Sequence, residues 1–141
     1  MPLTKKPVTG MKDITPAEMQ IREYVMNQIR ETYKSFGFSQ IETPCVEHIE
    51  NLTSKQGGDN EKLIFKVLKR GDKLNLETAQ DENDLTDSGL RYDLTLPLSR
   101  YYANNASSLP SPFKALQMEA CGGQTVPEGP LPPVYQCDID I

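Results

Sequence analysis

The sequence predicts an α+β fold in a single domain. Three observations predict it: a strongly marked helix near the N-terminus, short segments in which apolar and polar residues alternate as in strands, and glycine or proline where these segments end. A chain of 141 residues has the usual size of one domain and is long enough to bury a sizeable core.

The composition is that of a soluble globular protein. Hydrophobic residues make up 37% and charged residues 25% of the chain. No apolar run approaches the ~18 residues that cross a bilayer, and the first residues lack the apolar stretch of a signal peptide. The three cysteines form no CxxC pair, which argues against a disulfide framework or zinc site. We therefore expect a cytoplasmic protein without membrane contact.

Charge and histidine content exclude further classes. The formal net charge is −5, which argues against a domain whose main task is to bind a phosphate backbone. His48 is the one histidine of the sequence, so neither a histidine-based catalytic triad nor a histidine-rich metal site can form.

The helix near the N-terminus is predicted by sequence signals at both of its ends and by the spacing of its apolar residues. Thr15 precedes Pro16 and has Glu18 three residues later, which gives an N-cap, a proline in the first turn and a capping box. Gly37 supplies the C-terminal stop. We expect a helix of about 20 residues, with apolar residues at helical spacing: Ile21, Val25, Ile29, Tyr33 and Phe36.

Short strands follow. Residues 38–46 form an extended stretch in which Pro44 suits a strand end or edge, and a polar loop over 53–59 comes next. The turn composition of residues 70–72 predicts a hairpin, with its two strands over residues 63–68 and 73–76.

The middle of the chain ends in a strand and a second helix. Residues 78–89 are acidic and polar, which predicts a solvated excursion. Residues 90–94 alternate like a strand and continue into a helix that begins at Thr95, with Pro97 near its N-terminus. Its inner face is expected to carry Leu98, Tyr101 and Tyr102.

The composition changes in the last part of the chain. Residues 119–134 contain four prolines and three glycines, so they cannot sustain a helix, and the prolines at 130, 132 and 133 bar a central strand. Residues 135–141 return to strand-like alternation, and the chain stops within it. We expect an end that has been cut.

Four motifs are better explained as ordinary surface or core features. Gly57–Gly58 lacks the lysine of a phosphate loop, and His48 lies among polar residues after a strand. The acids of 81–87 lack the ligand spacing of a calcium loop. Cys121 has no base nearby in the sequence, which argues against a thiol nucleophile.

Two polar pairs stand out. Asp93 and Thr95 lie on the same side of an extended chain and can hold an ammonium group; in the alternative interpretation Asp93 pairs with Arg91 and Thr95 caps the helix. Gln136 and Asp140 share one face of the last strand and indicate a polar pocket, or else that face is an edge exposed to water.

The sequence resembles histidyl-tRNA synthetase, a class II aminoacyl-tRNA synthetase. The resemblance runs from Gly10 to Met118 and resumes at Tyr135. Six segments occur in the family's order: Gly10–Asp13, Phe36–Phe38, Glu42–Pro44 (similar to the first class II signature), Gly57–Phe65, Leu90–Thr95 and Tyr135–Asp140.

The resemblance implies an antiparallel class II catalytic sheet flanked by helices, here incomplete at the C-terminus. It implies a homodimer formed through the Thr15–Pro44 region, and an ATP-dependent ligase. In the family the histidine carboxylate attacks the α-phosphate of ATP, pyrophosphate leaves with Mg²⁺, and histidine passes to its tRNA. The family's histidine-binding residues match Asp93, the backbone of Leu94, and Thr95, with Gln136 and Asp140 as a second pair.

One segment departs from the family. Between Met118 and Tyr135 the family carries its second signature, which usually reads Trp-Arg-Ala-Asp-Arg-Pro and then Gly-Arg-Phe-Arg-Glu-Phe. Residues 119–134 contain no arginine or lysine, so the charge that stabilises the transition state is missing and no catalytic residue can be identified. The third signature and the anticodon-binding domain are also absent from these 141 residues.

The sequence therefore predicts the N-terminal part of a synthetase catalytic domain over 1–141, with residues 119–134 aberrant, that is inactive alone. The alternative is a non-catalytic paralogue that binds histidine as a regulatory subunit in histidine biosynthesis. A third possibility is an interaction domain without a ligand. No metal ligand is predicted, and ATP and Mg²⁺ enter only as family substrates.

Overall fold

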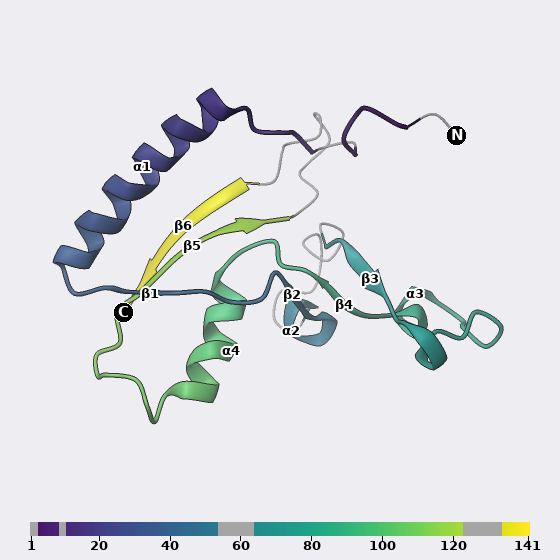
Figure 1. Cartoon of the computed structure of the whole chain (residues 1–141). Coiled ribbons are helices and arrows are strands. Elements are labelled where there is room, and N and C mark those ends of the chain that lie inside the picture. The colour runs from purple at the N-terminus through teal and green to yellow at the C-terminus, as the bar shows by residue number, and fades with distance from the viewer. Residues whose placement is uncertain (1–2, 9–10, 54–63, 123–133) are drawn as a thin grey trace.

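The computed structural model describes residues 3–8, 11–53, 64–122 and 134–141. It has the predicted α+β fold, with two three-stranded sheets (Figure 1). In chain order the elements are α1 Pro16–Ser35, β1 Ser39–Ile41, β2 Val46–His48, α2 Ile49–Thr53, β3 Lys66–Leu68, η2 Gly71–Lys73, α3 Glu82–Leu85, β4 Thr86–Leu90, α4 Thr95–Asn105, β5 Ala115–Cys121 and β6 Val134–Asp140.

Helix α1 confirms the predicted N-terminal helix and its caps. The Thr15 hydroxyl accepts a hydrogen bond from the Glu18 amide at 3.4 Å, and the Glu18 carboxylate accepts one from the Thr15 amide at 3.0 Å. Gly37 takes a φ of +80° just after the helix. The apolar stripe is only partly covered, because Ile21 is 67% exposed and Val25 is 48% exposed.

The first sheet has the order β1-β5-β6 and contains most of the core. Strand β5 lies at its centre, parallel to β1 and antiparallel to β6, so the sheet is mixed. Helices α1 and α4 lie on opposite sides of it (Figure 1). The buried apolar residues of β5 are Ala115, Leu116, Met118 and Cys121.

Strand β5 extends into the segment that departs from the family's sequence. Residues 119–121 complete β5 and pair with residues 134–136 of β6. The prolines that bar a strand come later, and residues 123–133 lie outside the described residues. A strand can therefore extend past Met118, because Glu119, Ala120 and Cys121 have ordinary backbones.

The second sheet has the order β2-β4-β3 and is antiparallel. It overturns two expectations. The predicted hairpin is wrong, because β3 pairs with β4 while residues 71–73 form the short 3-10 helix η2. The predicted solvated excursion over 78–89 is wrong in its second half, because Thr86–Leu90 is the central strand of this sheet.

Further corrections concern the polar segment around residue 50. His48 is the last residue of β2 rather than part of a loop, and the short helix α2 over Ile49–Thr53 was not predicted. The predicted loop over 53–59 falls mostly on residues outside the described part of the chain, as does the pair Gly57–Gly58.

The junction before α4 also differs from the prediction. Strand β4 ends at Leu90, so residues 91–94 form a bend rather than a strand, and α4 begins at Thr95 as predicted. Tyr102 is half exposed, although it was expected on the inner face of the helix, and its ring stacks with Phe113 at 6.3 Å between centroids. Within the described residues, none of the helices has the length and apolar character required to cross a membrane.

Candidate functional site

The bend between β4 and α4 holds the first predicted pair. Oδ1 of Asp93 accepts hydrogen bonds from the amides of Thr95 at 3.1 Å and Leu96 at 3.5 Å, so Asp93 caps α4. Leu94 is completely buried, and its carbonyl oxygen accepts a hydrogen bond from Nε2 of Gln117 at 3.2 Å. Thr95 is exposed on the first turn of the helix.

This geometry corrects the alternative interpretation of the pair. Thr95 does not cap the helix, and Arg91 pairs with Glu119 rather than with Asp93. The cap uses Oδ1 of Asp93, which leaves Oδ2 outside these two bonds. The aspartate can therefore stabilise the helix and offer an oxygen to a ligand.

The second predicted pair lies on β6. In the register of the two strands, Gln136 stands opposite Glu119 and Asp140 stands opposite Ala115. Asp138 lies between them and stands opposite Gln117. Because residues two apart in a strand point to the same side, these three polar residues share one face of the sheet.

Cys121 interacts with one residue of each pair. Its thiol donates a hydrogen bond to the side-chain oxygen of Gln136 at 3.4 Å. Burial raises the pKa of the same thiol, Arg91 opposes that rise, and the charge of Asp93 adds to it. Gln136 is therefore in contact with Cys121, and Asp93 lies within electrostatic range of it.

Asp138, the middle residue of this face, is also influenced by Asp93. Burial raises the pKa of Asp138, and the negative charges of Asp140 and Asp93 raise it further. Asp93, Asp138 and Asp140 therefore form one electronegative region where the start of α4 meets β6. Such a region suits a ligand with a positive charge or several hydrogen-bond donors.

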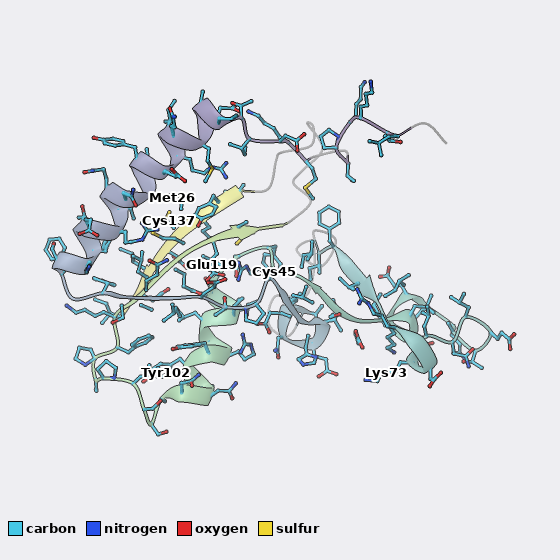
Figure 2. The ribbon with its side chains drawn as sticks, viewed as in Figure 1. Met26, Cys45, Lys73, Tyr102, Glu119 and Cys137 are labelled. Carbon is cyan, nitrogen blue, oxygen red and sulfur yellow. The ribbon has the colours of Figure 1, made fainter. Side chains whose placement is uncertain are left out.

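A buried polar cluster lies next to this region. Arg91 is 4% exposed and forms an ion pair with Glu119, which is 7% exposed. Thr43 completes the cluster, since its amide donates to Oε1 of Glu119 at 3.0 Å and its carbonyl accepts from Arg91 at 2.6 Å. Figure 2 places Glu119 near the middle of the molecule. Sequence reasoning missed the cluster, although charged residues at positions flanked by apolar ones, such as Glu119, were a signal for it.

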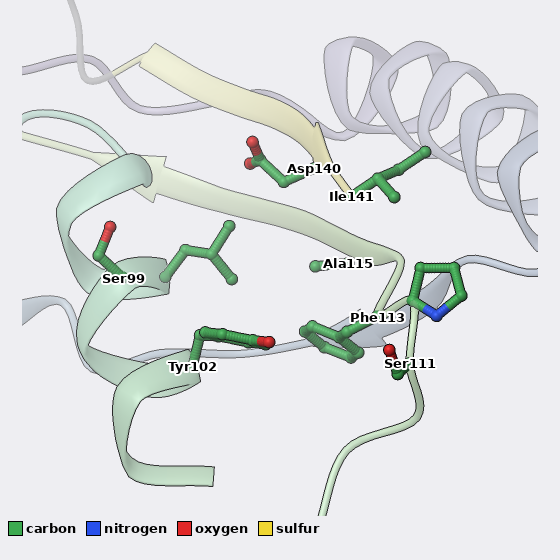
Figure 3. Close-up of a pocket in the computed structure, with 9 residues that line it drawn as sticks. Ser99, Tyr102, Ser111, Phe113, Ala115, Asp140 and Ile141 are labelled. Atoms are coloured by element: carbon green, nitrogen blue, oxygen red, sulfur yellow. The ribbon is translucent and has the colours of Figure 1, made fainter. Parts of the chain in front are cut away.

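A cavity of about 480 Å³ opens beside Asp140. Figure 3 shows Asp140 and Ile141 on one side of it and Tyr102 and Phe113 on another, with Ala115 between them. The lining is mainly apolar, with Ser99 and Ser111 as further polar groups. The electronegative region therefore adjoins a space that can take a small apolar or aromatic group.

One motif rejected from the sequence, Cys121, lies at this site beside Gln136, whereas His48 does not. His48 is exposed in the second sheet. Cys45, Cys121 and Cys137 carry free thiols. Within residues 3–8, 11–53, 64–122 and 134–141, three or more histidine, cysteine, aspartate or glutamate side chains nowhere gather in a group able to hold a metal ion.

Comparison with known proteins identifies one family. The model of the histidyl-tRNA synthetase family matches residues 10–116. A histidine–tRNA ligase of Leifsonia xyli subsp. xyli is 42% identical over 140 residues, which cover 96% of this chain and 32% of the relative. A histidine–tRNA ligase of Porphyromonas gingivalis is 39% identical, with 94% of this chain and 31% of the relative covered. The chain thus spans about a third of the length of these curated relatives.

Solved structures have a similar fold. The histidyl-tRNA synthetase of Nostoc sp. PCC 7120 superimposes with a TM-score of 0.75 at 29% identity, covering 96% of this chain and 28% of that one. A structure from Bacillus halodurans, described as an ATP phosphoribosyltransferase regulatory subunit/histidyl-tRNA synthetase, has a TM-score of 0.76. It covers 99% of this chain and 32% of the other, and at 19% identity it shows the likeness of fold alone.

Proposed function

Because the chain belongs to the histidyl-tRNA synthetase family, we propose that residues 1–141 form the N-terminal part of a class II catalytic domain that binds histidine. One observation supports the proposal: Gln136 accepts a hydrogen bond from the buried thiol of Cys121, and the charge of Asp93, from a different element, acts on the same thiol. One residue of each predicted pair thus lies near Cys121.

The chemistry of histidine fits these groups. Its α-ammonium group is positively charged and can donate hydrogen bonds to Oδ2 of Asp93 and to the Thr95 hydroxyl oxygen. The backbone of Leu94 is held against β5 by Gln117, so this part of the site is fixed before a ligand arrives. Gln136 and Asp140 offer oxygen atoms to the imidazole N–H, next to the apolar cavity that Asp140 lines.

Activation of histidine requires more than this site. Phosphoryl-type transfer needs positive charge around the reacting phosphate, and residues 119–134 contain no arginine or lysine. Within the described residues, no three histidine, cysteine, aspartate or glutamate side chains gather in a group that could hold a metal ion. We therefore assign no residue of this chain to ATP, Mg²⁺ or tRNA, and we propose that the chain alone binds histidine without forming the adenylate.

The proposed assembly is a homodimer formed through the Thr15–Pro44 region. Ile21 and Tyr24 are both 67% exposed on the outer face of α1, and Phe36 is 63% exposed. A second copy of the chain would cover these apolar side chains. The free thiols fit the cytoplasmic location expected of this family.

The second candidate function is a regulatory subunit in histidine biosynthesis. The observation that favours it is the loss of basic residues from 119–134 while Asp93, Thr95, Gln136 and Asp140 are kept. A protein that binds histidine without activating it has the properties of a histidine sensor. Such a subunit would alter the activity of the first enzyme of that pathway when histidine is added, whereas a synthetase fragment would not.

Calorimetric titration with histidine tests the proposal. We expect saturable binding, and we expect Asp93→Asn to weaken it about tenfold, because the amide keeps the shape of the carboxylate but loses its charge. Asp72→Asn is the matched control, since Asp72 is exposed on the 3-10 helix η2, outside both sheets. A titration of the unmodified chain that shows no heat of binding contradicts histidine binding.

Pyrophosphate exchange tests the second half of the proposal. The purified chain should show no histidine-dependent exchange of pyrophosphate into ATP and should charge no tRNA. Exchange clearly above a boiled control would show that residues 119–134 do supply the necessary charge.

A further inference from the structure

We propose that Arg91 is a positioning residue for the histidine site, because it fastens the α4 half of the site to the β5–β6 half. The inference rests on the proposed function and adds a residue that takes no direct part in binding. Arg91 belongs to neither predicted pair, and its side chain is buried.

The backbone of Arg91 joins the two sheets. Its amide donates to the carbonyl of Cys45 at 3.0 Å, next to β2, and its carbonyl accepts from the amide of Gly122 at 2.9 Å, at the end of β5. Residue 91 therefore lies between the second sheet and the first, two residues before Asp93.

The guanidinium group of Arg91 also connects the segment before β2 with β5. Nε and Nη2 both donate to the carbonyl of Ala120 at 3.1 Å, while Nη1 donates to the carbonyl of Thr43 at 2.6 Å and to its hydroxyl at 3.0 Å. A planar group with donors in fixed directions can satisfy this set, and a lysine ammonium cannot. Arg91 thus ties the segment before β2 to the end of β5.

Glu119 links this connection to the ligand face. It stands opposite Gln136 in the register of β5 and β6. Its Oε1 accepts from the Thr43 amide, and its Oε2 is in ion-pair contact with Arg91 but accepts no hydrogen bond of good geometry within the described residues. A cavity of about 290 Å³ adjoins both side chains. Arg91 is therefore the cation that balances a buried carboxylate directly beside a proposed ligand residue.

The consequence concerns the distance between the two halves of the site. Asp93, Leu94 and Thr95 follow Arg91 along the chain, whereas Gln136 and Asp140 are carried by β6 on β5. If Arg91 fixes residue 91 against Ala120 and Glu119, it also fixes Asp93 relative to Gln136. Small displacements of such groups lower affinity without unfolding the protein.

The molecule supplies a matched control. Glu47, which is buried, and Arg100, which is partly exposed, form another ion pair, with hydrogen bonds of 2.8 and 2.9 Å from Nε of Arg100 to the two carboxylate oxygens of Glu47. This pair joins β2 to the middle of α4. Arg100→Lys therefore weakens a comparable pair away from the junction at residue 91.

The experiment uses Cys121 as a reporter, in a chain whose exposed thiols are removed by Cys45→Ser and Cys137→Ser. Cys121 is 4% exposed and lies beside both Arg91 and Gln136, so its reaction with a thiol reagent measures opening of the junction. We expect Arg91→Lys to unfold cooperatively, to react about tenfold faster at Cys121, and to bind histidine about tenfold more weakly. Arg100→Lys should change neither quantity.

The outcomes separate this inference from the proposed function. Unchanged Cys121 reactivity and histidine affinity in Arg91→Lys overturn the inference, as does an equal change in Arg100→Lys. If Arg91→Lys does not fold, Glu119→Gln must show both effects, and its failure to do so also overturns it. If the unmodified chain binds no histidine, the proposed function fails, and the Cys121 arm still decides whether Arg91 holds the junction together.

Discussion

Gln117 and Leu94 are joined by a hydrogen bond of 3.2 Å from the side-chain amide of Gln117 to the backbone carbonyl of Leu94. Gln117 is 1% exposed in the central strand β5, and Leu94 is the fully buried residue just before α4. Oε1 of the same side chain accepts from the Thr43 hydroxyl at 3.3 Å. One buried amide thus connects the sheet, the start of α4 and the segment between β1 and β2.

Gln117→Leu should destabilise the fold because it leaves these partners unsatisfied. A buried polar group without a partner costs about 1 to 3 kcal/mol, and we expect a loss of that size in the free energy of unfolding measured in urea. Gln28→Leu on the exposed side of α1 is the control and should change stability little. A Gln117→Leu variant as stable as the parent would show that water satisfies these groups instead.

Gly89→Ala should also destabilise the fold, through lack of space. A Cβ atom at position 89 would lie 2.7 Å from Cγ2 of Ile64 and 3.2 Å from the backbone oxygen of Phe65. Overpacking of this kind costs about 1 to 3 kcal/mol. In Gly122→Ala the nearest atom would be 3.4 Å away, an ordinary contact, so this variant should keep the parent's unfolding midpoint. Equal midpoints for the two variants would contradict the packing argument.

Gly89 also shows why the second sheet could not be predicted. The strand Thr86–Leu90 contains aspartate, serine and glycine, so its hydropathy indicates a solvated loop. Its place at the centre of a sheet follows from pairing with β2 and β3, which precede it by 40 residues at the pair His48↔Ser88 and by 18 residues at the pair Leu68↔Thr86. Such long-range pairing leaves no mark in the local sequence.

The N-terminal helix could be predicted from the local sequence, and the bend at residue 93 could be predicted only in part. The signals of α1 are local, since Thr15, Glu18 and Gly37 act on adjacent backbone, and all were readable. At the bend, the sequence placed Asp93 at a strand-to-helix junction, but it could not show that Arg91 turns toward Glu119, a residue 28 positions away (119 − 91). The buried partner of an ion pair is a property of the fold rather than of the segment.

Glu18 should make the helical content depend on pH. Hydrogen bonds from Lys12 and then from the Thr15 amide lower the pKa of Glu18 from 4.5 to about 2. Because the folded pKa lies below the unfolded one, the stabilisation is fully present above about pH 4.5 and is lost as the pH falls toward 2. We expect circular dichroism at acidic pH to show this loss in the parent and to show less of it in Glu18→Gln. Since the group is exposed, added salt should reduce the difference between the two chains.

The exposed side of α1 should make the chain self-associate. Ile21, Tyr24 and Val25 are 67%, 67% and 48% exposed, and they form a larger apolar surface than a helix in a monomer normally leaves in water. Light scattering should show a mass that rises with concentration, and Ile21→Glu combined with Val25→Glu should reduce it to that of the monomer. Glu23→Gln on the same helix should leave the mass unchanged. A parent chain that stays monomeric at all concentrations would remove the basis for the proposed dimer.

The segment 119–134 should prove to be a reading-frame displacement of the family's second signature. Cys121–Val126 must be encoded TGY GGN GGN CAR ACN GTN. Read one base earlier, the five complete codons that follow can be TGG, CGG, GCA, GAC and CGT, which encode Trp-Arg-Ala-Asp-Arg, the order found in the family. Residues 129–132 are compatible with Gly-Arg-Phe-Arg when their codons are read one base later, and the resemblance returns in frame at Tyr135.

Resequencing this stretch of the gene decides the question, and we expect single-base shifts at three places: before the codons of Cys121–Val126, between these and the codons of residues 129–132, and before Tyr135. The physical reason to expect them is that β5 and β6 pair in full register on either side of the segment, from Cys121↔Val134 to Ala115↔Asp140, so the strands that carry the loop are kept while the loop's arginines are missing. Restoring the frame should return positive charge between these strands and, with it, histidine-dependent pyrophosphate exchange in a chain of the family's full length. Codons for Cys121–Val126 that do not spell the arginine-bearing signature when read one base earlier would end the hypothesis, and the segment would then be a loop of different origin.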